Sequence, residues 1–391
     1  MSKSEDTTVV AGWTAPGFEH VRDKFAQNFE EGLEVGAAFA AYRDGEPVVD
    51  LWGGIADRST GRAWTRDTIV LVFSTTKGAT AVCANRLAQD GVLDVDAPVV
   101  EHWPEFGAAG KSAVPMSDLL SHQAGLPWVD APMTLEDALA WEPLVRALEQ
   151  QAPVWEPGTA HGYHAVTYGH LVGEVVRRVT GKTLGTVFAE EVAAPLALDF
   201  WIGLPEEQEP RVAPLIGRVI GEGSGGGQTL TELAGPESTL TRALTVGGAF
   251  GGRGVFNSRA VRAAEVPAAN GVGDARSVAR MYAACIGEVD GVRLLSDEQL
   301  GDARRQRTSG PDRILLDLDL QWGLGFLVPS SLVQLGHGPH AFGHFGMGGS
   351  LGWADPDAGL AFGYVMNKMS LGMAGDARGY RLVKAVYDSL P

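Results

Sequence analysis

Cysteine, positive charge and long hydrophobic runs are all scarce in this sequence of 391 residues. The only cysteines are Cys83 and Cys285, and both lie in apolar stretches with helical spacing. Two such residues exclude a disulfide framework and a cysteine-built metal site, and they are typical of a reducing compartment. No window approaches the roughly 20 consecutive apolar residues that a membrane-spanning helix needs. We therefore expect a protein without a membrane span.

The net charge is strongly negative, because 31 lysines and arginines stand against 48 acidic residues and the formal charge is -17. Such a chain repels phosphate backbones and anionic lipid heads, which disfavours nucleic acid as a partner. The first ten residues are polar and acidic, and they lack the basic start and apolar run of a secretory signal. We expect a cytoplasmic location.

The beginning of the chain predicts a helix followed by a β-hairpin. Aromatic and aliphatic residues recur at helical spacing over residues 18–29, just after Pro16. Two strand-like runs follow at residues 35–42 and 47–53. They are joined through Asp44-Gly45, a dipeptide favoured where a hairpin turn needs positive φ.

The middle of the chain is helical, and its end returns to strands. A helical pattern begins at Ser74 and stops at Asp90-Gly91, and helices and loops then dominate to about residue 290. The glycine-rich residues 221–227 predict either a mobile loop beside a cleft or a plain surface loop. The expected elements near the end are strands at residues 323–328, 343–347, 349–354 and 360–366 and a helix at residues 380–387.

One antiparallel sheet assembled from both chain ends accounts for this order of elements. We predict an α+β fold in which residues 1–73 and 290–391 form a lobe with an antiparallel sheet flanked by helices. Residues 74–289 form an inserted, mainly helical lobe. The chain is longer than one hydrophobic core usually supports, which agrees with two packed lobes. A site would form in the cleft between them.

Ser74-Thr75-Thr76-Lys77 places a hydroxyl and an amine one helical turn apart at the start of the middle segment. A serine is a poor nucleophile until a base removes its proton, and a desolvated lysine can act as that base. The helix N-terminus adds backbone N–H groups where an oxyanion would develop. By itself the spacing also suits an N-cap serine with an unrelated lysine.

Two further elements can complete such a site. The turn Pro157-Gly-Thr-Ala-His-Gly-Tyr163 brings the phenol of Tyr163 to the start of a predicted helix, where it either shares a proton with Ser74 or packs the loop on the core. The glycine-rich strand Gly343-His-Phe-Gly-Met347 lets the backbone approach a ligand closely. The amides of Ser74 and Met347 would then form an oxyanion hole.

These elements, in this order, resemble the β-lactamase-like serine hydrolases: class C β-lactamases, D-alanyl-D-alanine carboxypeptidases and, above all, family VIII carboxylesterases. The resemblance spans most of the chain. Besides Ser-x-x-Lys, it rests on Gly91-Val-Leu-Asp-Val-Asp-Ala-Pro98, Asp118-Leu-Leu-Ser-His-Gln-Ala-Gly-Leu-Pro127, Pro157-Gly158-Thr159 before Tyr163, and Trp322-Gly-Leu-Gly325.

The resemblance implies a β-lactamase/transpeptidase-like fold and a serine hydrolase that needs no metal or other cofactor. It makes Ser74 the nucleophile, Lys77 its base and Tyr163 the second proton carrier. It also assigns the oxyanion hole to the amides of Ser74 and Met347.

Two departures from the β-lactamase pattern bear on the substrate. Tyr163-His164-Ala165 stands where the family has Tyr-x-Asn, so the amide that would bond a β-lactam or a peptide is missing. His344-Phe345-Gly346 replaces Lys-Thr-Gly, which exchanges a fixed cation for a largely neutral imidazole. We therefore expect small, uncharged, short-acyl esters as substrates, bound at His344, Phe345 and Gly346. His344 either assists proton transfer or shapes the pocket.

Several alternatives remain open at the level of the sequence. The same fold can carry a β-lactamase, a D-amino-acid peptidase or an acyltransferase, or it can be a binding module without turnover. Gly348-Gly-Ser350-Leu-Gly352 matches the nucleophile elbow of α/β-hydrolases, although Ser350 lies between two predicted strands rather than before a helix. A third alternative is a zinc site built from His337, His340 and His344 with His161 or His164.

Overall fold

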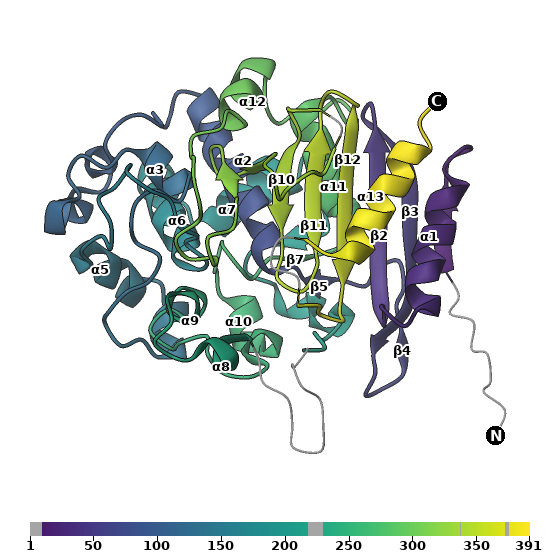
Figure 1. Ribbon diagram of the computed structural model, residues 1–391, viewed down its shortest axis with the longest axis horizontal. Helices are drawn as coiled ribbons and strands as arrows, with labels where there is room; N and C mark the ends of the chain where they lie inside the picture. The colour runs from purple at the N-terminus through teal and green to yellow at the C-terminus, as the bar shows by residue number, and fades with distance from the viewer. Residues whose placement is uncertain (1–9, 218–229, 337, 372–374) are drawn as a thin grey trace.

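The computed structural model describes residues 10–217, 230–336, 338–371 and 375–391, and its centre is a nine-stranded antiparallel sheet (Figure 1). The strand order is β1-β3-β2-β12-β11-β10-β9-β8, with β4 paired to β3. The strands are β1 (Val10–Thr14), β2 (Gly36–Arg43), β3 (Glu46–Asp57), β4 (Arg62–Ala63), β8 (Gln321–Trp322), β9 (Leu327–Val328), β10 (Phe342–Phe345), β11 (Leu351–Asp355) and β12 (Leu360–Met366). Strand β2 pairs with β12 along its length, from Arg43 opposite Leu360 to Ala37 opposite Met366. The two ends of the chain therefore meet in the middle of one sheet, as predicted.

The predicted hairpin is confirmed. Strands β2 and β3 are joined at Asp44 and Gly45, whose φ values of 51° and 83° are both positive. Two successive positive φ angles match the right-handed twist of the strands, and aspartate followed by glycine tolerates them best. The glycine-rich residues 221–227 lie outside the described ranges.

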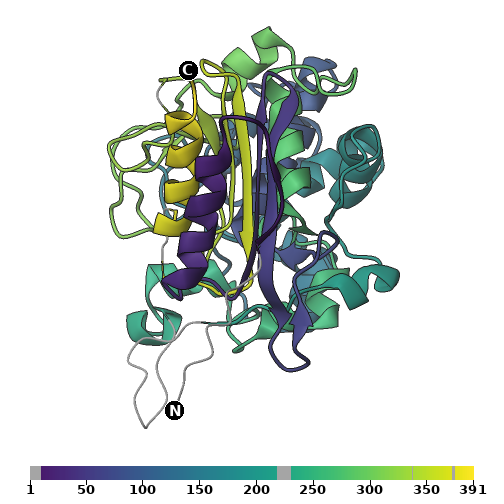
Figure 2. The same ribbon diagram turned by 90° about the vertical axis from the view of Figure 1, so that its right-hand side faces the viewer.

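Helices cover both faces of the sheet (Figure 2). The terminal helices α1 (Glu19–Glu30) and α13 (Ala377–Asp388) pack side by side on one face, and both were predicted. Helix α11 (Ala275–Ile286) covers the other face, against β2, β11 and β12. It lies within residues 74–289, the range predicted for the helical lobe, so that part of the range packs on the sheet. The division into two lobes stays a prediction.

Two glycines of the sheet allow α11 to come close. A Cβ atom at Gly363 would lie 2.1 Å from the carbonyl oxygen of Ala275, and one at Gly352 would lie 2.4 Å from the ring of Tyr282. Neither distance is possible for a real side chain. Glycine at these positions therefore fixes the height at which the helix rests on the sheet.

Helix α2 (Thr76–Gln89) forms the centre of the helical side and is buried on all sides from Thr76 to Asn85. It packs against α6 (Thr167–Thr180), α7 (Leu184–Phe188) and strand β10. None of the helices in the described ranges is long and apolar enough to cross a membrane. The remaining α-helices are α3 (Met116–Leu120), α4 (Leu135–Leu139), α5 (Glu142–Gln150), α8 (Leu230–Ala234), α9 (Thr239–Thr245), α10 (Arg259–Ala263) and α12 (Asp297–Ala303).

Two local predictions need correction. Residues 323–328 are not one strand, because a turn at Gly323 and Gly325 separates the two-residue strands β8 and β9. In this turn Gly323 N–H donates to Phe326 O at 2.9 Å, and Gly325 has a φ of 84°. A second, three-stranded sheet was missed: β5 (Val70–Leu71), β7 (Val272–Gly273) and β6 (Phe200–Trp201). Its strands are too short to leave a periodic signal.

Candidate active site

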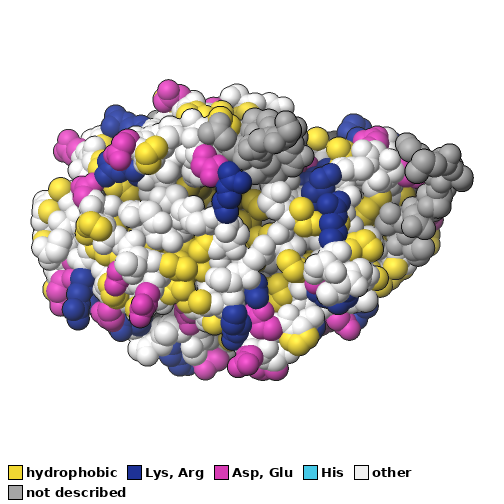
Figure 3. Space-filling model, turned by 90° about the horizontal axis from the view of Figure 1, so that it is seen from below, with side chains coloured by type: hydrophobic (Ala, Val, Ile, Leu, Met, Phe, Trp, Pro, Cys, Tyr) yellow, Lys and Arg dark blue, Asp and Glu magenta, His cyan; other side chains and the backbone are white. Residues whose placement is uncertain are grey.

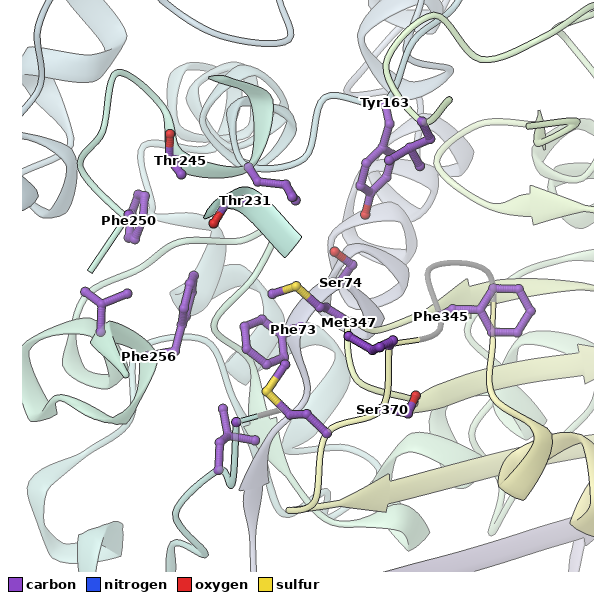
Figure 4. Close-up of a pocket in the computed structure, with 18 of the residues that line it drawn as sticks. Phe73, Ser74, Tyr163, Thr231, Thr245, Phe250, Phe256, Phe345, Met347 and Ser370 are labelled. Carbon is purple, nitrogen blue, oxygen red and sulfur yellow. The ribbon is translucent and has the colours of Figure 1, made fainter. Parts of the chain in front are cut away.

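Ser74 lies in a tight 3-10 turn, Phe73–Thr75, that leads directly into α2. The preceding residue, Phe73, has a φ of 46°, a conformation that bulky residues avoid. Such strain is common where a fold must direct one side chain into a cleft. Ser74 is half-buried, and its hydroxyl and that of Tyr163 point toward each other (Figure 4).

Lys77 is completely buried one turn after Ser74. Its Nζ lies 3.2 Å from Ser74 Oγ, 2.6 Å from Ala165 O and 2.9 Å from Ala268 O. Burial lowers the pKa of Lys77 well below its ordinary value of 10.5, and no carboxylate in the described residues forms an ion pair with it. A neutral amine has two N–H groups, which the two carbonyls accept. Its lone pair is then left for the proton of Ser74.

Tyr163 is held beside this pair by its own backbone and ring. Its N–H donates to Asp312 Oδ1 at 3.1 Å, and its ring stacks on Trp322 with centroids 5.7 Å apart. The Tyr163 hydroxyl faces the Ser74 hydroxyl (Figure 4), and Lys77 Nζ lies 4.6 Å from the centre of the Tyr163 ring. Burial raises the pKa of Tyr163 above its usual range, so its hydroxyl keeps its proton in the resting site.

Met347 occupies the turn between β10 and β11, close to Ser74 (Figure 4). A Cβ at Gly346 would lie 2.2 Å from Val72 O, so glycine is required where this turn meets the one that carries Ser74. Ser350 ties the same two turns together, because its Oγ donates to Val72 O at 2.7 Å and bonds Thr75 Oγ1 at 2.9 Å. The Met347 amide makes no hydrogen bond to other described residues. Ser350 itself is buried in a strand-turn-strand segment, which lacks the helix of a nucleophile elbow.

Arg378, from α13, supports this turn from the far side. Its guanidinium donates to Gly348 O at 2.8 Å, to Asp376 Oδ2 at 2.8 Å and to Glu34 Oε2 at 2.9 Å. All three side chains are buried. The arginine therefore links the body of the sheet layer to the turn that presents Met347.

Replacing Arg378 with methionine is expected to lower the free energy of unfolding by about 3–5 kcal/mol, because two buried carboxylates would lose their cation. Urea unfolding followed by circular dichroism measures this. The matched control is Arg381→Met on the same helix, whose partner Glu31 is 39% exposed. A surface pair of this kind contributes little to stability. Equal losses of unfolding free energy in the two variants would contradict the role of Arg378 as the buried link to this turn.

The predicted substrate-binding residues of β10 differ in their surroundings. His344 is buried, and its Nδ1 lies 2.7 Å from Phe345 O, which assigns the proton to that nitrogen. Burial, assisted by nearby Lys77, lowers the pKa of His344 to about 3, so the imidazole is neutral. Its Nε2 has no partner among the described residues. Phe345 stacks on Trp353 and also reaches the cavity, whereas Gly346 serves the turn described above.

The histidines of the alternative zinc site do not converge. His340 bonds Asp357 at the surface, His164 bonds Gly162 O and Leu126 N–H, and His161 bonds Leu320 O. His337 lies outside the described ranges. Over the residues that the structure describes, no three histidine, cysteine or acidic side chains form a group that could hold a metal ion.

A cavity of about 270 Å³ opens beside Ser74, and its lining is mainly apolar. Figure 3 shows the face of the molecule seen from below, where hydrophobic side chains lie in the hollowed middle and several Lys and Arg side chains lie beside it. The lining includes Phe73, Ser74, Tyr163, Leu215, Phe250, Arg253, Phe256, Leu315, Trp322, His344, Phe345, Met347 and Met369.

The sequence did not predict the cavity wall formed by residues 250–257. Its only local signal is the dense glycine pattern Gly247-Gly-Ala-Phe-Gly-Gly-Arg-Gly254, which marks turns but not a pocket. Trp322, in the family-like Trp-Gly-Leu-Gly pattern, is the tryptophan in the lining. Trp128, Trp141, Trp155 and Trp353 are not part of the described lining.

Comparison with known proteins supports the fold and points to a family. The family model described as Beta-lactamase matches residues 25–387. A curated relative from Mycobacterium tuberculosis, "Esterase/beta-lactamase LipL", is 40% identical over 372 residues, which cover 92% of this chain and 83% of the relative.

Solved structures are similar over almost the whole chain. A family VIII carboxylesterase has a TM-score of 0.88 and 41% identity, covering 98% of this chain and 100% of its own. A penicillin-binding protein homologue from Caulobacter crescentus has a TM-score of 0.88 and 38% identity, covering 98% and 100%. The fold thus has precedents at substantial identity.

Proposed function

The chain belongs to the beta-lactamase family of serine hydrolases, and on this premise we propose that it is a carboxylesterase that cleaves small, uncharged esters through an acyl-enzyme on Ser74. The observation that carries the proposal is the buried amine of Lys77, 3.2 Å from Ser74 Oγ, with two carbonyls to occupy its N–H groups. That arrangement makes the amine a base toward the serine hydroxyl.

Acylation begins when Lys77 takes the proton of Ser74 and Ser74 Oγ attacks the ester carbonyl carbon. The amides of Ser74 and Met347 stabilise the oxyanion that forms. As the intermediate collapses, the C–O bond to the alcohol breaks, and Tyr163 donates its proton to the leaving oxygen. The proton on Lys77 then restores the Tyr163 hydroxyl. In deacylation, water gives a proton to the Lys77–Tyr163 pair and attacks the acyl carbon. The bond from the acyl carbon to Ser74 Oγ then breaks, and Ser74 Oγ takes that proton back.

The charges around Ser74 support an uncharged substrate. His344 is neutral where a β-lactamase-like site would carry a fixed cation. The one arginine in the described lining, Arg253, makes a two-pronged ion pair with Glu232. A substrate carboxylate would have to compete with that pair. β-Lactam hydrolysis is a second candidate, favoured by the relative named as both esterase and beta-lactamase.

The test is hydrolysis of p-nitrophenyl butyrate beside a chromogenic cephalosporin, combined with mass spectrometry after treatment with a serine-reactive phosphonate. We expect rapid ester turnover, slow or no cephalosporin cleavage, and an adduct on the peptide that contains Ser74. Cephalosporin rates that rival ester rates would favour a β-lactamase, and an adduct elsewhere would reject Ser74.

The pH dependence distinguishes the two candidate bases. The free amine is the active form of Lys77, so kcat/KM should rise with pH through its pKa and then stay flat. Because burial lowers that pKa well below 10.5, the rise should be complete well below pH 10.5. A phenolate base would instead place the rise above pH 10, because burial raises the pKa of Tyr163. Initial rates on a substrate without an ionisable group measure the profile.

Replacing Tyr163 with phenylalanine is expected to lower kcat on an alkyl ester by about 10²–10³-fold, because the leaving alkoxide loses its proton donor. The loss should be smaller on p-nitrophenyl butyrate, since p-nitrophenolate leaves without a proton. Steady-state rates of ethyl butyrate and p-nitrophenyl butyrate hydrolysis provide the comparison. Equal losses on both esters would instead assign Tyr163 to activation of Ser74.

A cytoplasmic location and the lack of a nucleic-acid partner remain proposals that rest on composition. The net charge of -17 supports the second of them. The two cysteines are buried and free, which is compatible with a reducing compartment.

A further inference from the structure

The rings that line the cavity form two separate groups, and Ser74 lies between them. Tyr163 and His344 both pack against Trp322 on one side. On the other side Phe256 contacts Phe73 edge-on, with centroids 4.9 Å apart, and stacks on Phe250 at 5.6 Å. Figure 4 shows Phe250 and Phe256 across Ser74 from Tyr163 and Phe345.

The phenylalanine side is mainly apolar, and its polar side chains Asn257, Thr245 and Arg253 are already engaged. Asn257 bonds both the N–H and the carbonyl of Leu215, and Thr245 Oγ1 donates to Thr241 O at 2.8 Å. Arg253 is paired with Glu232. A charged or hydroxylated group placed here would lose hydration and find its side-chain partners already engaged, which disfavours it. A flat apolar group would gain contacts with ring faces and edges.

The direction of the ester follows from the proton donor. In the proposed mechanism Tyr163 protonates the leaving oxygen, so the alcohol must lie on the side of Tyr163. The acyl group then extends from the Ser74 ester to the opposite side, where Phe73, Phe250 and Phe256 form the wall.

We propose that Phe73, Phe250 and Phe256 form an acyl subsite for an aromatic ring, so that the substrates are esters of arylalkanoic acids with small alcohols. This inference rests on the proposed esterase function and adds the substrate class to it. Phe256 is the residue that determines specificity, because it contacts both other rings and is only half-buried.

The test compares two isomers that differ only in the direction of the ester, methyl phenylacetate and benzyl acetate. Their leaving alcohols have similar acidity, so a difference in kcat/KM reports on binding of the ring. We expect methyl phenylacetate to be hydrolysed at least about tenfold better, which corresponds to one or two aromatic contacts. Equal rates, a preference for benzyl acetate, or turnover of p-nitrophenyl butyrate with neither isomer would overturn the subsite.

Two variants test which residues cause the preference for methyl phenylacetate. Phe256→Ala should lower kcat/KM for methyl phenylacetate by about tenfold or more and leave methyl acetate within about threefold. The matched control, Leu315→Ala, removes an apolar side chain from the lining outside the phenylalanine group and should not lower the preference for methyl phenylacetate. Loss of that preference in Leu315→Ala but not in Phe256→Ala would reject the assignment.

Failure of the esterase proposal has a different signature from failure of the subsite. A protein that hydrolyses no ester and forms no phosphonate adduct on Ser74 overturns both proposals. A protein that hydrolyses p-nitrophenyl butyrate but shows no preference between the isomers overturns the subsite alone. The isomer ratio of the unmodified enzyme gives this answer even if Phe256→Ala does not fold.

Discussion

Replacing Ser74 with alanine is expected to lower kcat on p-nitrophenyl butyrate by a factor on the order of 10⁶, to the rate of the buffer or close to it. Where a nucleophile and its base act as a unit, removing either one costs nearly as much as removing both. Ser74 is half-buried, and among the described residues its side chain is hydrogen-bonded to Lys77 and faces Tyr163. We therefore expect the variant to fold normally, which thermal unfolding can verify.

The control for this variant is Ser350→Ala. Ser350 Oγ bonds Val72 O and Thr75 Oγ1 at the base of the Ser74 turn. Its removal leaves a buried carbonyl without that donor and should lower the free energy of unfolding by about 1–3 kcal/mol. The variant should still be labelled by a phosphonate on Ser74. If Ser74→Ala kept its rate while Ser350→Ala lost it, the nucleophile would be Ser350.

The parts of the site that could be predicted from sequence are those set by local spacing. Ser74 and Lys77 are one helical turn apart, so any helix beginning near Ser74 brings amine and hydroxyl together. The hairpin at Asp44-Gly45 is determined in the same way, because the turn itself demands positive φ. The helix of residues 18–29 had a clear apolar spacing and lies within one residue of α1.

The parts of the site that could not be predicted from sequence depend on contacts between distant segments. Asp312 supports Tyr163 from 149 residues away, and Arg378 reaches Gly348 and Glu34 from the last helix. Neither residue lies in a sequence motif that would predict its hydrogen-bond partner. The phenylalanine wall has the same origin, because Phe73 and Phe256 come from distant segments, and the strand before Ser74 is held by pairing with residues 272 and 273.

Replacing Lys77 with methionine should abolish turnover as completely as the loss of Ser74, again by a factor on the order of 10⁶ in kcat. Methionine has nearly the length and volume of lysine, so the buried space stays filled, and the carbonyls of Ala165 and Ala268 lose one donor. We expect the free energy of unfolding to change by no more than about 3 kcal/mol. The rate of phosphonate labelling at Ser74 should fall along with kcat, because both reactions need an activated hydroxyl.

Arginine at position 77 provides the sharper comparison, because it keeps a hydrogen-bond donor but not a base. A guanidinium stays protonated at any pH at which the protein is folded, so it can bond the two carbonyls yet cannot accept the Ser74 proton. Lys77→Arg should therefore be inactive at every pH. If Lys77 served only to hold the site together, arginine would restore part of the activity. Activity above about 1% in either variant would transfer the role of base to Tyr163. The rise of kcat/KM would then lie above pH 10 rather than below it.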